Sequence, residues 1–151
     1  MRSLVTLALI ASALLAAPVL PAAETKPSGA AEPRTAHRVV FELTSADPEA
    51  WNAVLNNIEN VRKSLGENAT KVELVAHGKG LDFLKLTHTA QKERMQKLAE
   101  EGVVFAACEN TMKRQKVTRA QLMPLVSTVD SGVAEIVRKQ EDRWSYIRSG
   151  N

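Results

Sequence analysis

The segment VVFAACENTMKR, residues 103–114, joins a continuous apolar run to a polar turn and contains the single cysteine of the chain, Cys108. A run such as VVFAA predicts a strand that is covered on both faces, as strands are in a parallel sheet. Gly102 precedes the run, and the turn-forming residues Glu109, Asn110 and Thr111 follow it. Cys108 is therefore expected at the end of a buried strand.

Strand and helix patterns alternate on both sides of this segment. Asp47 and Pro48 mark a helix start, because Asp caps helix N-termini and Pro suits the first helical position. Apolar residues at steps of three and four continue that helix to Leu65. The patterns predict strands at 37–43, 71–77, 125–129 and 144–148, and helical regions at 48–65, 81–101 (best patterned over 90–101), near 118–122, and from 131.

Strands that alternate with helices at this spacing predict βαβ crossovers. We therefore expect a single three-layer α/β/α domain with a mostly parallel sheet of about five strands and helices on both faces. In the last helix, Val133, Ile136 and Val137 are expected to face the sheet. Met95, Met112 and Met123 are expected to fill the core. The order of the strands does not follow from periodicity.

The N-terminus has the pattern of a secretory signal peptide. Arg2 precedes an apolar run from Leu4 to Ala17, and prolines and small residues follow it. We expect a signal peptide at 1–23, a disordered linker at 24–36 and the folded domain at 37–151. The protein is then periplasmic and has no stable membrane span after cleavage. The alternative is an uncleaved N-terminal anchor.

The charge pattern gives little support to a nucleic-acid-binding protein. The chain has 20 basic and 17 acidic residues, for a formal net charge of +3. Lys113, Arg114, Lys116 and Arg119 form a small basic cluster without aromatic residues between them. We expect no nucleic-acid partner.

Candidate site residues follow the predicted strands, because ligands bind at the carboxyl ends of strands in open α/β sheets. Thr44 and Ser45 follow the first strand, and Asp130 precedes the last helix. The residues predicted to bind a ligand or to act chemically are His77, Gly78, Gly80, Cys108, Asn110, Thr111, Ser131 and Gly132.

Cys108 has three possible roles on sequence grounds. A single cysteine forms no internal disulfide, so it is an inert buried thiol, an intermolecular partner or a reactive group. If Glu109 opens a helix, the N–H groups at the helix N-terminus favour the thiolate; a protonated His77 would add to this and Glu109 would oppose it. His77, His88 and Cys108 lack a metal-site spacing, so neither a metal nor a cofactor is predicted.

Three segments together resemble the DsrE/DsrF-like family of small sulfur-metabolism proteins: VELVAHGKGLDFL (72–84), GVVFAACENTM (102–112) and STVDSGVAEIVRKQEDRWSYIR (127–148). The resemblance implies a three-layer fold, a homotrimer or homohexamer, and a cysteine after the third strand that carries sulfur as a persulfide. Cys108 has the matching position.

On this resemblance, we expect Cys108 to take sulfane sulfur from a donor and pass it to an acceptor thiol. His77 would orient the thiolate, and Asn110 and Thr111 would donate hydrogen bonds to it. One alternative is a non-catalytic oligomeric module with an inert buried cysteine, which binds a small ligand in a cleft at residues 77–80 and 131–132. Another is a purely structural oligomer.

Overall fold

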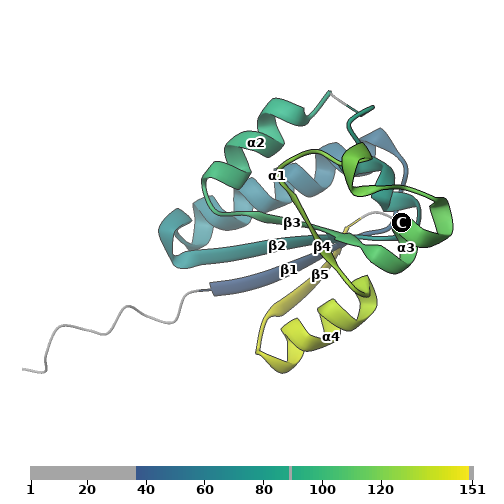
Figure 1. Ribbon diagram of the computed structural model, residues 1–151. Helices are drawn as coiled ribbons and strands as arrows, with labels where there is room; N and C mark the ends of the chain where they lie inside the picture. Colours follow the sequence, from purple (N-terminus) through teal and green to yellow (C-terminus); the bar gives the residue numbers. More distant parts are fainter. Residues whose placement is uncertain (1–36, 89, 150–151) are drawn as a thin grey trace, which may run out of the picture. The chain divides into compact units, whose positions relative to one another are not determined.

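The computed structural model describes residues 37–88 and 90–149 (Figure 1). The predicted signal peptide at 1–23 and linker at 24–36 lie outside the described residues. Among the described helices, none combines the length and the apolar character that a membrane crossing needs.

Five strands and the helices between them make up the domain, in the expected alternation. Each strand lies within one residue of its predicted bounds. The elements are β1 (His37–Leu43), α1 (Pro48–Leu65), η1 (Glu67–Ala69), β2 (Thr70–Ala76), η2 (Gly78–Leu84), α2 (Lys92–Glu100), β3 (Val104–Cys108), α3 (Glu109–Gln115), η3 (Arg119–Gln121), β4 (Val126–Val129), α4 (Gly132–Glu141) and β5 (Ser145–Ser149).

The strands form one parallel sheet with the order β4-β3-β2-β1-β5. From β1 the chain steps outward through β2 and β3 to β4, and it then returns to the other edge to form β5. A right-handed crossover places its helix on a face that depends on the direction of the step. The reversal after β4 therefore places α4 on the face opposite to α1 and α2 (Figure 1).

The larger core lies between the sheet and the helices α1 and α2. Helix α1 begins as the sequence predicts: Asp47 accepts a hydrogen bond from the backbone N–H of Glu49 at 2.9 Å, and Pro48 stands at the first helical position. The buried apolar side chains of α1 face the β1 and β2 side chains of this core, namely Trp51, Val54, Leu55 and Ile58 against Val39, Phe41, Leu43, Val72 and Leu74. The predicted core methionines, Met95, Met112 and Met123, belong to the same cluster.

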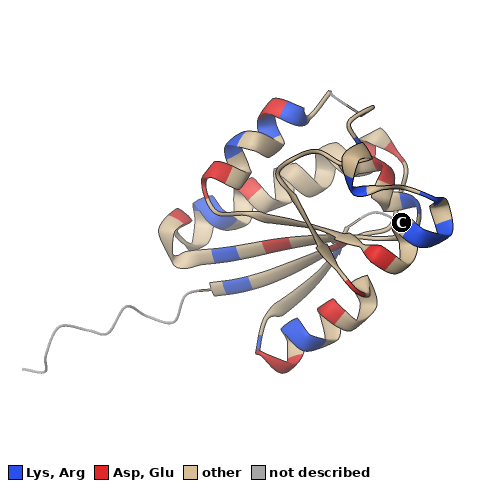
Figure 2. Ribbon diagram, in the orientation of Figure 1, with Lys and Arg blue, Asp and Glu red and all other residues tan. Residues whose placement is uncertain are grey.

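Two predicted helical regions are less regular than expected. The region at 81–101 divides into the 3-10 helix η2 and the α-helix α2. Thr118 does cap a short helix, but η3 ends before the buried Leu122. The basic cluster of the sequence lies at the end of α3 and in the segment after it, at the right of Figure 2.

On the other face of the sheet, α4 is the helix that packs against the strands. Its core is small and consists of Ile136 with a few strand residues and the partly buried Trp144. The prediction that Val133 and Val137 face the sheet is wrong, because they are 58% and 48% exposed. Helix α4 instead turns Gly132, Ile136 and Lys139 inward.

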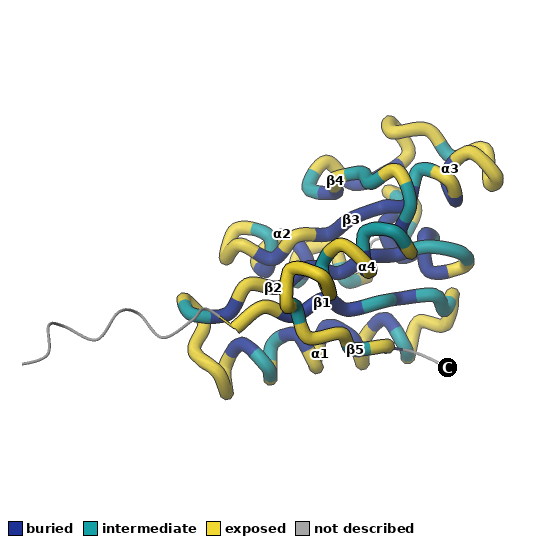
Figure 3. Tube along the Cα trace, turned by 90° about the horizontal axis from the view of Figure 1, so that it is seen from below, coloured by how far each residue is buried: buried dark blue, intermediate teal, exposed yellow. Residues whose placement is uncertain are grey.

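The buried Glu73 on β2 explains this orientation of α4. The Lys139 ammonium group lies 2.6 Å from the Glu73 carboxylate and 4.4 Å from the centre of the Trp144 ring. A lysine can bury its aliphatic stem and still reach a partner with its charge, so the sheet-facing stripe of α4 is partly polar. Figure 3 shows the exposed surface that remains along α4 and β5.

Candidate functional site

Cys108 lies where the topology of the sheet reverses. The connections after β2 and β3 pack on the face of α1 and α2, whereas the connection after β4 is α4 on the other face. Cys108 ends β3 and is paired in register with Val129 of β4. In open α/β sheets the crevice at such a reversal is the usual place for ligands.

Two helices begin around the Cys108 side chain. Cys108 is the N-cap residue of α3, and the N-terminal residue of α4, Gly132, packs against it. A Cβ atom on Gly132 would lie 3.2 Å from the Cβ atoms of both Cys108 and His77. This close approach favours glycine, and Cys108 is only 5% exposed.

The surroundings of the sulfur favour the thiolate. Burial raises the pKa of the Cys108 thiol, but hydrogen bonds from the Thr111 hydroxyl and from the N–H groups of Gly132, Thr111 and Asn110 outweigh burial and hold the pKa below its usual value. The Asn110 N–H is shared, since it also lies 3.3 Å from the carbonyl oxygen of Asp130. These hydrogen bonds favour the anionic form of the sulfur.

Thr111 is oriented as a donor to Cys108. Its hydroxyl oxygen accepts a hydrogen bond from the backbone N–H of Gly78 at 3.1 Å, and the side chain is 1% exposed. A hydroxyl group has one proton and two lone pairs. Because one lone pair is engaged with Gly78, the proton is free to point to the sulfur.

His77 is a neighbour of Cys108, and a carboxylate binds its ring. The Nε2 atom of His77 lies 2.7 Å from an oxygen of Glu42 on β1. The second oxygen of that carboxylate accepts a hydrogen bond from the Tyr146 hydroxyl on β5. Burial raises the pKa of Glu42, but Tyr146, His77 and Arg148 lower it further than burial raises it, so the net direction is down.

Glu42 and Tyr146 were not among the site residues predicted from the sequence. A signal for Glu42 was present, because it is the charged residue within the apolar strand VVFEL. The contacts of Glu42 depend on the strand order, which the sequence does not give. Because β1 lies between β2 and β5, Glu42 faces His77 on one side and Tyr146 on the other.

The other predicted site residues have mainly structural contacts. Gly78, at φ +57°, links η2 to α3, because its N–H binds Thr111 and its carbonyl oxygen accepts from Gln115 at 2.7 Å. Gly80 packs against β1, where a Cβ atom would lie 2.1 Å from the carbonyl oxygen of Leu43. Ser131 caps α4 by accepting from the N–H of Ala134.

Residues that the sequence placed near the site as weaker candidates lie in other surroundings. Ser45 supports the start of α1, since its carbonyl oxygen accepts from the Trp51 indole at 2.9 Å. His88 packs edge-on against the same indole, with ring centres 4.9 Å apart. Within the described residues, no group of His, Cys, Asp and Glu side chains is arranged to hold a metal ion.

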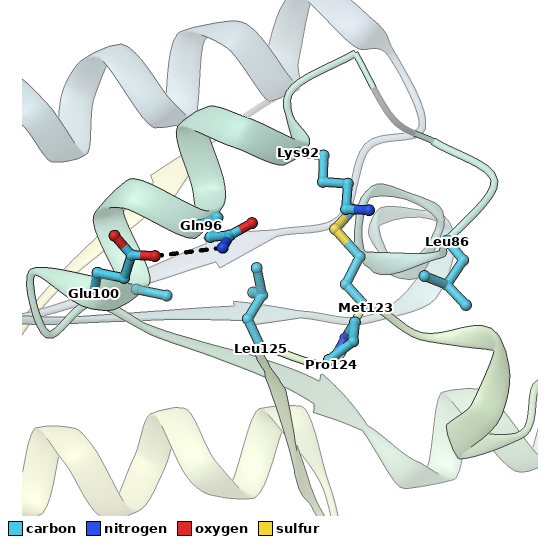
Figure 4. A pocket seen from close by; sticks show the side chains of 8 residues that line it. Leu86, Lys92, Gln96, Glu100, Met123, Pro124 and Leu125 are labelled. Atoms are coloured by element: carbon cyan, nitrogen blue, oxygen red, sulfur yellow. Dashed lines mark hydrogen bonds between the residues drawn. The ribbon is translucent and has the colours of Figure 1, made fainter.

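An apolar cavity of about 520 Å³ lies away from Cys108, between α2 and the segment before β4. Figure 4 shows Lys92, Gln96 and Glu100 of α2 on one side, with Met123, Pro124 and Leu125 across from them. Gln96 donates a hydrogen bond to Glu100 at 3.3 Å. None of the predicted site residues lines this cavity.

The comparisons with known proteins agree with this architecture. The model of the DsrE/DsrF-like family matches residues 25–148. A protein of unknown function from Methanobacterium thermoautotrophicum, MTH1491, has a similar structure, with a TM-score of 0.70 and 31% sequence identity over 74% of this chain and 98% of that one. A search of curated proteins finds no match.

Both findings cover most of the chain, and the family match includes Cys108, His77 and all five strands except the last residue of β5. The chain belongs to the DsrE/DsrF-like family, which is related to sulfur metabolism.

Proposed function

We propose that this member of the DsrE/DsrF-like family carries sulfane sulfur as a persulfide on Cys108. One observation carries the proposal: a thiol without a disulfide partner lies at the N-terminus of α3 and against Gly132 of α4, where hydrogen-bond donors from both helices lower its pKa. Thiolates, and not thiols, attack sulfur. An inert core cysteine has no need of such donors.

The proposed reaction is a sulfur transfer without net oxidation. The Cys108 thiolate attacks the outer sulfur of a donor persulfide, R–S–SH, and forms a new S–S bond. The S–S bond of the donor breaks, and the donor leaves as a thiolate that takes up a proton. In the second half, an acceptor thiolate attacks the outer sulfur on Cys108, and the Cys108 thiolate leaves.

The same donors assist the second half of this reaction. A thiolate that is already stabilised is a better leaving group, so the Thr111 hydroxyl and the Gly132 N–H favour both uptake and release. His77, which Glu42 orients through its Nε2 atom, is proposed to position the incoming donor and to exchange the proton with the leaving thiolate.

The low exposure of Cys108 fits a carrier that works in an oxidising compartment. A thiol that is 5% exposed is shielded from unwanted oxidation. Entry of a donor requires a small displacement of the α4 N-terminus, where Gly132 covers the thiol. The main contacts of α4 with the sheet are Ile136 and the Lys139–Glu73 ion pair.

Intact-mass analysis of the protein, purified without reductant and then treated with polysulfide, tests the proposal. We expect one or more added sulfur atoms on the natural protein, their removal by dithiothreitol, and no addition to Cys108→Ser. A natural protein that takes up sulfur only after denaturant is added would contradict the proposal.

The second candidate is a non-catalytic module that binds a small ligand. The apolar cavity of about 520 Å³ favours it, because this volume suits a small molecule. In that case Cys108 stays inert in the native state, and Leu125→Arg, which would fill the cavity, abolishes ligand binding while Cys108→Ser does not.

We also propose that the chain is exported to the periplasm and forms a homotrimer or homohexamer. Its N-terminal pattern supports export, and sequencing of the mature N-terminus after cell fractionation tests it. The exposed side chains of Val104, Val133, Val137 and Tyr146 support assembly. Light scattering that gives a monomer at micromolar concentration would contradict assembly.

A further inference from the structure

A second surface feature lies beside α3 and takes no part in the proposed chemistry. It is a groove of about 490 Å³ between α3, the segment that follows α3, and β4. Met112 and Val117 supply apolar surface to this groove, and Thr128 lines it from β4. We refer to it as the α3 groove.

The charged residues of the α3 groove are mostly basic. Lys113, Lys116 and Arg119 line it, and Glu109 is its one lining acid. Glu109 accepts a hydrogen bond from the Thr128 hydroxyl at 2.9 Å. Across the described ranges, 37–88 and 90–149, no carboxylate forms an ion pair with Lys113 or Lys116, which are both exposed.

Arg119 is fixed in place. Its guanidinium group donates hydrogen bonds to the backbone carbonyls of Met123, Pro124 and Val126, at 3.2, 3.2 and 2.6 Å. One wall of the groove is therefore rigid, and a rigid wall lowers the entropic cost of binding. The two lysines remain free to move toward an anionic partner.

This combination of apolar surface and basic rim selects the chemistry of the occupant. A small inorganic anion displaces only a few waters of about 30 Å³ each, so it would leave most of the groove and its apolar surface unfilled. Single-stranded nucleic acid stacks its bases on aromatic side chains, and no aromatic residue lines the groove. An acidic polypeptide segment with interspersed apolar residues matches both the charge and the apolar surface.

We infer that the α3 groove docks an acidic, partly apolar segment of the protein that exchanges sulfur with Cys108. The identity of this partner as a sulfur donor or acceptor rests on the proposed function. Glu109, at one end of the groove, directly follows Cys108. The seven residues of α3 span about 10 Å, a distance that about three extended residues cover.

The geometry fixes the orientation of the docked segment. Its acidic side chains contact Lys113 and Lys116 at the far end of α3, because Glu109 repels them at the near end. Its reactive cysteine then lies about three residues from the acidic stretch, toward Cys108.

A direct test uses the mature full chain and a fluorescein-labelled peptide that repeats the unit Glu-Glu-Leu. We expect saturable binding by fluorescence polarisation. The double variant Lys113→Gln/Lys116→Gln should bind roughly five- to tenfold more weakly, as expected for the loss of two exposed ion pairs. Added salt should weaken binding of the natural protein more than that of the variant.

The matched control is Lys63→Gln/Lys71→Gln, which removes the same charge from two exposed positions outside the groove. It should bind as the natural protein does. An equal loss in this control would overturn the inference, because binding would then follow net charge alone. Equal binding of a peptide with serine in place of leucine, or displacement by millimolar thiosulfate, would also overturn it.

The same assay separates the groove from the sulfur chemistry. Cys108→Ser should bind the peptide normally, because the thiol does not line the groove. If the peptide binds but Cys108 takes up no sulfur, the proposed function fails, and with it the partner's identity. If Cys108 takes up sulfur but the peptide does not bind, the docking inference fails and the carrier function stands.

Discussion

Replacing Thr111 by valine tests the site most directly, because valine has the shape of threonine without its hydroxyl. In the native protein this hydroxyl donates to the Cys108 sulfur and accepts from the Gly78 N–H at 3.1 Å. A hydrogen bond to a charged group contributes about 1.5–3 kcal/mol. We therefore expect Thr111→Val to raise the pKa of Cys108, which means that the acid dissociation constant of its thiol falls at least tenfold.

The alkylation rate should fall by less than the thiolate fraction. A thiolate of higher pKa is more nucleophilic, with a Brønsted slope of about 0.4–0.5. The higher nucleophilicity therefore offsets about half of the decrease in the logarithm of the alkylation rate. The expected net effect with iodoacetamide is roughly a three- to tenfold slower reaction in the folded protein. The loss of an acceptor for the Gly78 N–H should also lower the free energy of unfolding by about 1–3 kcal/mol.

The pH dependence of thiolate absorbance measures the pKa without requiring access to the buried thiol. Thr111→Ser is the control: it keeps the hydroxyl and removes one buried methyl group, at a cost of about 0.8 kcal/mol. Its titration should resemble that of the natural protein. A Thr111→Val protein whose thiolate forms at the same or a lower pH would refute the role given to this hydroxyl.

Three further predictions follow from the packing and charges around the site. Gly80→Ala should yield no stable folded domain in thermal denaturation, because its Cβ would lie 2.1 Å from a backbone oxygen. Gly78→Ala meets no atom within 4 Å, so it should lower the free energy of unfolding by only about 1–2 kcal/mol, the cost of a left-handed backbone for alanine. Gly132→Ala must push apart Cys108, His77 and Val75, so urea titration should show a free energy of unfolding that is lower by about 1–3 kcal/mol. Mass analysis should show faster alkylation of Cys108, and an unchanged alkylation rate would contradict the covering role of α4. The pKa of Glu42 is lowered in the folded state, so its ionised form stabilises the fold above the ordinary carboxyl pKa, and this contribution is lost as the pH falls through the lowered value. Glu42→Gln should therefore be less stable than the natural protein at pH 7, and this difference in the free energy of unfolding should shrink below about pH 4. A difference that stays constant with pH would count against the Glu42–His77–Tyr146 network.

Local patterns were sufficient to predict the five strands and helix α1 of this fold. Continuous apolar runs indicated strands that are covered on both faces, and the Asp47–Pro48 start defined α1, because these signals act between residues close in the chain. The position of Cys108 at the end of β3 followed in the same way, whereas the helix α3 that begins after it was only one possibility beside a turn. Strands that alternate with helices along the chain then predicted a parallel sheet with helices on both faces.

The site depended on contacts between distant segments, which no local pattern encodes. The strand order placed Cys108 at the reversal between β3 and β4, and it placed Glu42 between His77 and Tyr146. Val133 and Val137 had the right spacing for a buried stripe, but the buried charge of Glu73 turned Lys139 toward the sheet and left both valines exposed. Sequence thus determined which residues end the strands, whereas the tertiary structure decided which of them meet, because the pKa of a thiol depends on donors that the fold brings from α3 and α4 to one sulfur atom.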